Sequence, residues 1–306
     1  MTREPEEDRI MAIQPQNIPN LRQLCSGFAN IYRSASPDHA SEEEVRVLKE
    51  LLGIRLIIDL RSSEELQDSS HGGRKPIDIS YERLKVTEEE MEDTKRKGTT
   101  GKLLSGEAQG VRCVLSFATK KYKARLLTTM SACQKVLLMF MALIDRVFHT
   151  WLSQRYLTTR VLNPRGVKQQ YTDLVDTSQT VIFTILKLLS EPRNVPALIH
   201  CTAGKDRTGV TAALIQLAVG WPKKNIIEDY TASTQGIKPI YEKLHTLYCK
   251  KMGFTEDLLL SSKEYIKAVL EHVDNTYGSV NDYLTSFGFG PDDQEKLKRN
   301  ILRSKI

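Results

Sequence analysis

The 306-residue sequence contains no cysteine pair with the spacing of a zinc site or of a disulfide framework. Its five cysteines are scattered along the chain: Cys25, Cys113, Cys133, Cys201 and Cys249. This pattern argues against a small disulfide-rich secreted protein and supplies no structural metal centre. We therefore expect a reducing, cytoplasmic environment, with no metal and no other cofactor.

Long apolar segments are equally scarce. Residues 1–16 are acidic and polar, lack the apolar core of a signal peptide, and are predicted to form a disordered leader. The most apolar run, Val136–Ile144, is nine residues long and ends at Asp145, which makes it too short to span a bilayer. We expect a protein without a transmembrane segment.

No nucleic-acid or nucleotide motif is present. The basic residues are not interleaved with aromatic ones in any known module, so nucleic acid is not an expected partner. The segment Gly98–Lys102 lacks the spacing of a P-loop for nucleotides. The net charge of +6 is modest and is compatible with an anionic substrate, with an anionic membrane surface or with ordinary solubility.

One ten-residue stretch, HCTAGKDRTG at 200–209, carries the chemistry. The short apolar run Val195–Ile199 before it predicts a buried strand. The segment Val210–Val219 after it has the apolar spacing of a helix. The stretch is thus predicted to join the end of a strand to the N-terminus of a helix, where unpaired N–H groups favour an anion.

The spacing from Cys201 to Arg207 is long enough to bend around one tetrahedral phosphate, with the intervening amides pointing inward. Gly204 allows the turn, and the planar guanidinium of Arg207 can hold two phosphate oxygens. The same positive groups would stabilise a thiolate at Cys201, which is then placed to attack phosphorus. The predicted chemistry is phosphoryl transfer to Cys201 followed by hydrolysis of the phosphocysteine, with Arg207 and the amides in place of a metal.

The stretch resembles the signature of the protein tyrosine phosphatase superfamily, and in particular a subgroup of tyrosine and phosphoinositide phosphatases with an HCxxGKDRTG loop. The resemblance implies that Cys201 is the nucleophile and that Arg207 clamps the phosphate. It implies that Thr208 hydrogen-bonds the sulfur, although a helix-capping role is also open, and that His200 orders the loop. The implied phosphate cradle consists of Thr202, Ala203, Gly204, Lys205, Asp206 and Arg207.

The general acid is less directly indicated. Trp221-Pro222 is followed by Lys223, so we interpret it as the end of one helix and the start of another rather than as an acid-bearing loop. The resemblance implies Asp206 as the acid, with pairing to Lys205 to shape the loop as the alternative. Lys205 either adds positive charge for acidic substrates or is solvated. The rival acids are Asp59, Asp173 and Asp176.

Before the loop, Ser41–Glu44 is a capping box that predicts the start of a helix ending at Gly53. Arg55–Leu60 predicts a central strand, followed by a second strand around Ile77–Leu84. Asp59 and Arg61 are expected to form an ion-pair network bracing a loop, with the pocket border as the alternative. The family's Asp-Leu-Arg is followed by a glutamate, here Glu64, and Arg33 is expected in a structural ion pair.

Residues 86–165 match the resemblance least and are predicted to be a helical insertion or lid. The apolar stripe Met139, Phe140, Leu143, Val147 and Trp151 is interpreted as core, with lid packing as the alternative. A basic cluster at 120–125 is interpreted as a solvated helix face, with anionic lipid as the alternative. One amphipathic helix is predicted over Tyr171–Glu191, and mostly helices after Pro222.

The expected fold is α/β, with a mainly parallel central sheet flanked by helices in a single Cys-x5-Arg phosphatase domain over residues 17–306 that carries the helical lid. The expected activity is hydrolysis of phosphate monoesters, with phosphotyrosine-containing protein as the leading substrate. A phosphoinositide or inositol phosphate substrate is the first alternative, and peripheral contact with an anionic membrane is compatible with it. A catalytically weak phosphate-binding module is the second, which the intact pair of Cys201 and Arg207 disfavours.

Overall fold

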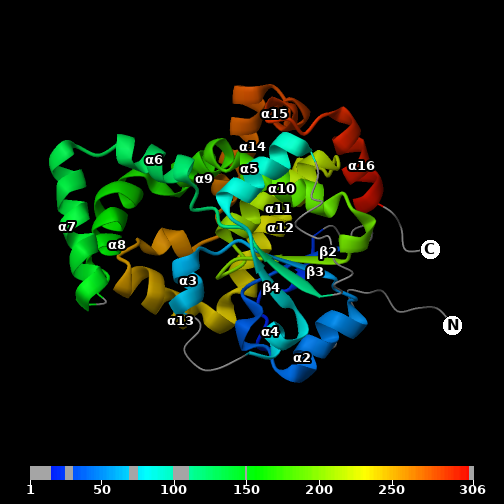
Figure 1. Ribbon diagram of the computed structural model, residues 1–306, viewed down its shortest axis with the longest axis horizontal. Coiled ribbons are helices and arrows are strands. Elements are labelled where there is room, and N and C mark those ends of the chain that lie inside the picture. The colour runs from blue at the N-terminus through cyan, green and yellow to red at the C-terminus, as the bar shows by residue number, and fades with distance from the viewer. Residues whose placement is uncertain (1–14, 25–29, 69–74, 99–109, 149, 303–306) are drawn as a thin grey trace.

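The computed structural model describes residues 15–24, 30–68, 75–98, 110–148 and 150–302. Its centre is one six-stranded sheet in the order β1-β2-β6-β3-β5-β4 (Figure 1). β1 pairs antiparallel with β2, and every other neighbouring pair is parallel. The strands are β1 (Arg22–Gln23), β2 (Ile31–Ser34), β3 (Leu56–Asp59), β4 (Glu82–Lys85), β5 (Val111–Val114) and β6 (Ala197–His200). The predicted fold class, a mainly parallel sheet flanked by helices, is confirmed.

Alternate side chains of the central strands face two helical layers, as the two-residue period of a strand requires. Ile58 and Ile199 belong to the larger core, whereas Ile57 and Leu198 face the smaller one. The helices contributing to the larger core are α5 (Glu88–Lys97), α9 (Asn163–Thr177), α10 (Gln179–Leu189), α11 (Asp206–Ala218), α12 (Lys223–Gly236), α14 (Lys263–Tyr277), α15 (Val280–Ser286) and α16 (Pro291–Ile301). The smaller layer holds α2 (Glu42–Arg46), its π-helical continuation η2 (Val47–Leu51) and α4 (Pro76–Ser80).

Several local predictions are confirmed. The Ser41 hydroxyl accepts from the Glu44 amide and the Glu44 carboxylate accepts from the Ser41 amide, which is the predicted capping box. Gly53 ends that helix with a φ of 62°. α11 ends at Ala218, and α12 begins at Lys223 directly after Pro222, as predicted for a helix stop and restart.

Three predicted elements need correction. Residues 77–84 are not one strand: Pro76 takes the first position of α4, which fixes a helical φ, and β4 follows only at Glu82. Residues 171–191 are not one helix, because Ser178 leaves helical geometry (φ −109°, ψ 22°) between α9 and α10. The strand β5 was not predicted, because Arg112 interrupts its apolar pattern, although the Arg112 side chain is fully buried.

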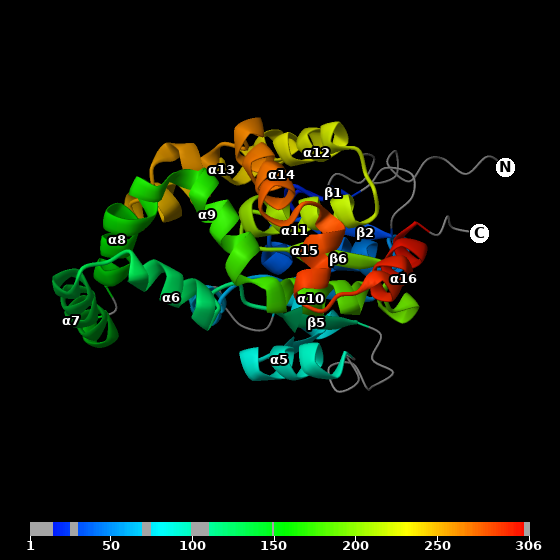
Figure 2. The same cartoon turned by 90° about the horizontal axis from the view of Figure 1, so that it is seen from above.

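A helical excursion leaves the sheet after β5 and stands at one end of the molecule in both views (Figures 1 and 2). It contains α6 (Lys120–Thr128), α7 (Ala132–Phe148), α8 (Leu152–Leu157) and the π-helical turn η3 (Thr158–Leu162). Residues 86–165 therefore also include α5 and β5 of the main body. The core interpretation of the apolar stripe on α7 is wrong, because no residue of α7 is buried.

Candidate active site

The loop of residues 200–209 lies where the central parallel strand β6 ends. His200 is the last residue of β6, Cys201 follows it, and α11 begins at Asp206. Cys201 is almost fully buried, with 2% of its surface exposed. Ligands in open α/β sheets bind beyond the carboxyl ends of such strands, so the fold places the nucleophile candidate at the expected edge.

The tight turn of this loop requires glycine at position 204. Gly204 has a φ of +65°, and a Cβ atom there would lie 2.1 Å from the backbone oxygen of Ser34. In the described part of the chain, the backbone N–H groups of Ala203–Arg207 donate to no protein acceptor. Free donors of this kind, together with the N-terminal end of the α11 dipole, favour an anion.

Arg207 is held by a glutamate that the sequence analysis did not identify. Its Nη1 and Nη2 atoms donate to Oε2 and Oε1 of Glu65, at 2.6 and 2.7 Å, from the first turn of α3 (Ser63–Asp68). Burial alone would raise the pKa of Glu65, but the Arg207 charge holds that pKa at about 2. The Glu65 carboxylate also accepts from the Thr202 hydroxyl at 2.7 Å, so it connects the clamp to the start of the cradle.

A local signal for Glu65 exists in the sequence. Ser62 and Glu65 form an S-x-x-E pattern, and in the structure the Ser62 amide donates to the Glu65 carboxylate at 2.9 Å. The family resemblance pointed instead to Glu64, whose side chain lies outside the described part of the molecule. The capping contact fixes the Glu65 side chain over the loop.

Asp206 lies in a buried polar cluster. Its Oδ1 atom accepts from Nζ of Lys205 at 2.7 Å and from the hydroxyl of Tyr171 at 2.5 Å. Lys205 is 1% exposed and also donates to the backbone oxygen of Leu260, so it is not a solvated loop lysine. Burial disfavours the ammonium form, but the Asp206 charge outweighs it and raises the pKa of Lys205. The pairing of Lys205 with Asp206 that the sequence left open is therefore present.

The three other candidate acids are paired with residues outside the loop. Asp59 is fully buried and bonded to Arg61 and Arg112, which is the ion-pair network expected from the sequence. Asp173 pairs with Arg165, and Asp176 accepts from the imidazole of His272 at 2.7 Å. Asp206 is the candidate acid that sits within the loop itself.

Thr208 and His200 occupy opposite ends of the loop. The Thr208 hydroxyl is buried and has no hydrogen-bond partner among the described residues, and it lies within α11 rather than at its N-cap. His200 is fully buried, with Nδ1 3.1 Å from the Cys201 backbone oxygen and Nε2 3.6 Å from Asp59. Burial lowers the pKa of His200 to about 4, even though the Asp59 charge opposes this shift.

Two distant side chains brace the loop from outside. Nδ2 of Asn20 donates to the backbone oxygens of Ala203 and Gly204, at 3.2 and 3.0 Å. Arg33 donates to the same Gly204 oxygen at 2.9 Å and forms the predicted structural ion pair, with Asp229 at 2.6 Å. These contacts hold the turn closed, and no local sequence pattern points to Asn20.

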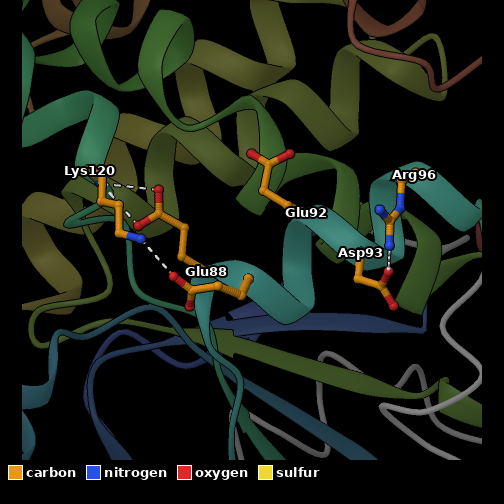
Figure 3. A pocket seen from close by; sticks show the side chains of 6 residues that line it. Glu88, Glu92, Asp93, Arg96 and Lys120 are labelled. Atoms are coloured by element: carbon orange, nitrogen blue, oxygen red, sulfur yellow. Dashed lines mark hydrogen bonds and ion pairs between the residues drawn. The ribbon is translucent and has the colours of Figure 1, made fainter.

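A separate charged pocket is lined by side chains of α5 and by Lys120, the first residue of α6 (Figure 3). Its lining residues are Glu88, Glu89, Glu92, Asp93, Arg96 and Lys120. Most of these charges are paired within the pocket, because Lys120 donates to Glu89 at 2.6 Å and Arg96 donates to Asp93 at 2.5 Å. It contains no residue of the 200–209 loop, so we do not place the functional site there.

The buried Cys201 thus follows a central parallel strand, and Arg207 lies in the first turn of the next helix, which is the Cys-x5-Arg arrangement predicted from the sequence. The sequence profile of the tyrosine phosphatase family matches residues 27–303. The chain belongs to the tyrosine phosphatase family, which confirms the resemblance seen in the loop.

Curated relatives match over shorter stretches. The triple specificity protein phosphatase PtpB of Mycobacterium tuberculosis is 27% identical over 139 residues, which cover 41% of this chain and 50% of that protein. The inositol diphosphatase DSP3 of Arabidopsis thaliana is 37% identical over 49 residues, covering 16% of this chain and 24% of that protein. These matches span at most about half the length of the two relatives.

Among solved structures, the core catalytic domain of the PP-IP phosphatase SIW14 from S. cerevisiae, in complex with citrate, shares 16% identity with this chain. The match covers 70% of this chain and 76% of that one, with a TM-score of 0.30. A likeness of that size says nothing further about this protein.

Proposed function

We propose that the protein hydrolyses phosphate monoesters through a phosphocysteine intermediate. The observation that carries this proposal is the loop geometry: Cys201 lies at the base of a turn whose free amides and whose Arg207 clamp serve one anion site. A bound phosphate would have its charge balanced there without a metal ion. The nucleophile would be the thiolate of Cys201.

The proposed reaction has two chemical steps. The Cys201 sulfur attacks phosphorus, the bond to the leaving oxygen breaks, and Asp206 in its protonated form supplies the proton to that oxygen. Water then attacks the phosphocysteine and gives its proton to the Asp206 carboxylate, which restores the acid. The S–P bond breaks, and the Thr208 hydroxyl donates a hydrogen bond to the departing thiolate. Arg207 and the cradle amides hold the phosphate oxygens throughout, and His200 keeps the loop backbone in place.

The leading substrate is a phosphotyrosine-containing protein. Tyr248, from η6 (His245–Lys251) behind α13 (Tyr241–Leu244), is well placed to contribute an aromatic wall. Tyr248 is partly buried and packs against a small apolar cluster that includes Ala203 of the loop. A flat aromatic ring next to the clamp suits a phosphotyrosine ring.

A phosphoinositide or inositol phosphate is the second candidate. It is supported by the similarity to the inositol diphosphatase DSP3 and by the excess of basic residues in the helical excursion. Peripheral contact with an anionic membrane belongs to this proposal, as does a cytoplasmic location, which would keep Cys201 reduced. No described helix is long and apolar enough to cross a bilayer.

The test is turnover of phosphotyrosine peptides, phosphoserine peptides and a phosphoinositide panel by the wild type and by Cys201→Ser. We expect phosphate release from phosphotyrosine peptides by the wild type only. Release only from inositol-containing substrates would select the second candidate. If folded wild-type protein binds these esters with no turnover, the chain is a phosphate-binding module and the enzyme proposal fails.

A further inference from the structure

α7 carries an apolar face that nothing in the described molecule covers. The helix has 17 residues, and none of them is buried. Six of its large apolar side chains are at least half exposed: Val136, Met139, Phe140, Leu143, Val147 and Phe148. Helices of soluble domains normally turn such residues toward a core. Contiguous exposed apolar surface of this kind marks an interaction site.

The exposed residues form one continuous face. Val136, Phe140, Leu143 and Val147 are separated by four, three and four positions, which places them one above another on a helix. The helix is anchored through a different stripe, since Leu138 packs against the small cluster formed by α6 and η3. The exposed face takes no part in this contact.

The charge of the residues around this face indicates which kind of partner it binds. Residues 120–162 contain eight basic residues and one acidic residue, so this segment has a net charge of +7, whereas the whole chain has +6. The one acidic residue, Asp145, accepts from the amides of Leu152 and Ser153 at 2.9 Å and so caps α8. Lys135 and Arg146 are exposed and have no acidic partner in the described structure.

The position of α7 leaves this face accessible. β5 runs parallel to its neighbour β3 and therefore also to β6. Because α6 begins shortly after β5 ends, the excursion leaves the sheet at the same end of the strands that holds Cys201. In both views α7 forms the outer end of the excursion (Figures 1 and 2). A flat surface approached by α7 would thus meet the end of the molecule that carries the phosphate site.

We propose that the exposed face of α7 docks on an anionic lipid membrane. An amphipathic helix with large apolar side chains on one side and basic residues at its borders lies in the plane of a bilayer, with the apolar side chains among the headgroups and acyl chains. Lys135 and Arg146 would contact lipid phosphates. A second copy of this chain is a poorer occupant, because two segments of net charge +7 would repel each other.

The test measures co-sedimentation with phosphatidylcholine vesicles with and without phosphatidylserine. No phosphate monoester is present, so the outcome is independent of the proposed activity. Phe140→Glu/Val147→Glu is the test variant. Ile79→Glu is the matched control, because Ile79 on α4 is 63% exposed but lies away from the excursion. Circular dichroism melting shows whether each variant folds.

We expect the wild type and Ile79→Glu to sediment with phosphatidylserine vesicles and the double variant to stay in the supernatant. Lys135→Gln and Arg146→Gln should each weaken the partition coefficient about fivefold, and high salt should do the same. The proposal is overturned if the wild type does not bind anionic vesicles, or if the folded double variant binds as well as the wild type. It is also overturned if sedimentation analysis shows a dimer that the double variant abolishes while vesicle binding is absent.

Trp151 provides a second readout. The chain has two tryptophans, and Trp151 follows α7 with 36% of its surface exposed. In a Trp221→Phe background its emission should shift to the blue on addition of phosphatidylserine vesicles and not of phosphatidylcholine vesicles. An unchanged spectrum in protein that co-sediments would contradict docking through this end of the molecule.

Discussion

The carboxylate of Glu65 meets the guanidinium of Arg207 edge to edge, with two N–O distances of 2.6 and 2.7 Å. Because such a paired contact fixes the plane of the guanidinium, Glu65 already orients Arg207 for the phosphate of the proposed reaction. Burial alone would lower the pKa of Arg207, but Glu65 keeps that pKa well above its ordinary value. Glu65 is therefore a positioning residue for the proposed reaction.

Replacing Glu65 by glutamine should lower kcat/KM about tenfold to a hundredfold, because a clamp that loses its orientation holds phosphate less well. Inhibition by inorganic phosphate should weaken in parallel, a change that loss of stability alone would not produce. Asp293→Asn is the control, since Asp293 is also a partly buried, paired carboxylate, but with Lys187 and far from the loop. Tighter phosphate binding by Glu65→Gln would show instead that Glu65 competes with the substrate for Arg207.

Asp206→Asn should slow hydrolysis of a phosphotyrosine peptide about a hundredfold but affect para-nitrophenyl phosphate much less, since a good leaving group needs no proton. The measurement is kcat on both substrates. Tyr171→Phe, which removes the 2.5 Å hydrogen bond to Asp206, should produce a smaller loss with the same substrate dependence. Equal losses on both substrates would mean that Asp206 only shapes the loop together with Lys205.

The loop could be predicted from the sequence because its chemistry lies within ten consecutive residues between a strand and a helix. The residues that support it could not, because they come from distant parts of the chain. Asn20, Glu65 and Tyr171 reach the loop only through the sheet order and the packing of α9, neither of which a local pattern contains. Only the Ser62–Glu65 pattern offered a local signal.

Two errors have a common physical cause. Hydrophobic periodicity reports which face of an element is apolar, but not whether a partner covers it, so the stripe on α7 was assigned to a core that is absent from the described structure. Conversely, β5 was not predicted, because the charged Arg112 interrupts its apolar pattern, although Asp59 and Asp38 neutralise this arginine inside the fold at 2.8 Å each. Burial of charge depends on partners that a single segment does not reveal.

Thr208→Ala should slow the second chemical step, because its buried hydroxyl has no other partner among the described residues and is free to stabilise the leaving sulfur. Rapid-mixing kinetics should show a burst of leaving group followed by a slower steady state. Thr208→Ser keeps the hydroxyl and should restore most of kcat. If Thr208→Ala shows no burst and an unchanged kcat, the hydroxyl serves only the structure.

Gly204→Ala should destabilise the fold by more than about 2 kcal/mol and abolish phosphate binding. The positive φ at this position is unfavourable for alanine, and there is no room for a side chain. The added carbon would lie 2.1 Å from the Ser34 oxygen. Gly220→Ala is the matched control, with a φ of +82° and nothing within 4 Å, and it should lose only about 1 kcal/mol. Urea unfolding of both variants gives the comparison, and equal losses would contradict the close approach.

The buried His200 should make stability depend on pH between 7 and 5. Its pKa is lowered to about 4 by burial, while an unfolded histidine has a pKa of about 6.5. Because the unfolded chain binds the proton first as pH falls, this contribution is complete above about pH 6.5 and is lost toward pH 4, with a slope of at most about 1.4 kcal/mol per pH unit. Urea unfolding at pH 7 and pH 5 measures this loss.

His39 must be removed from that comparison, because its pKa is also lowered, by burial and then by Lys243. The measurement is therefore made in a His39→Gln background, and NMR of the His200 ring protons should show no titration above pH 5. A His200 resonance that titrates near pH 6.5 would mean that the ring is not held neutral under the loop. In that case His200 would carry a positive charge next to Cys201. The contact between the His200 ring and the Cys201 backbone oxygen would then be made by a charged imidazolium and not by a neutral ring.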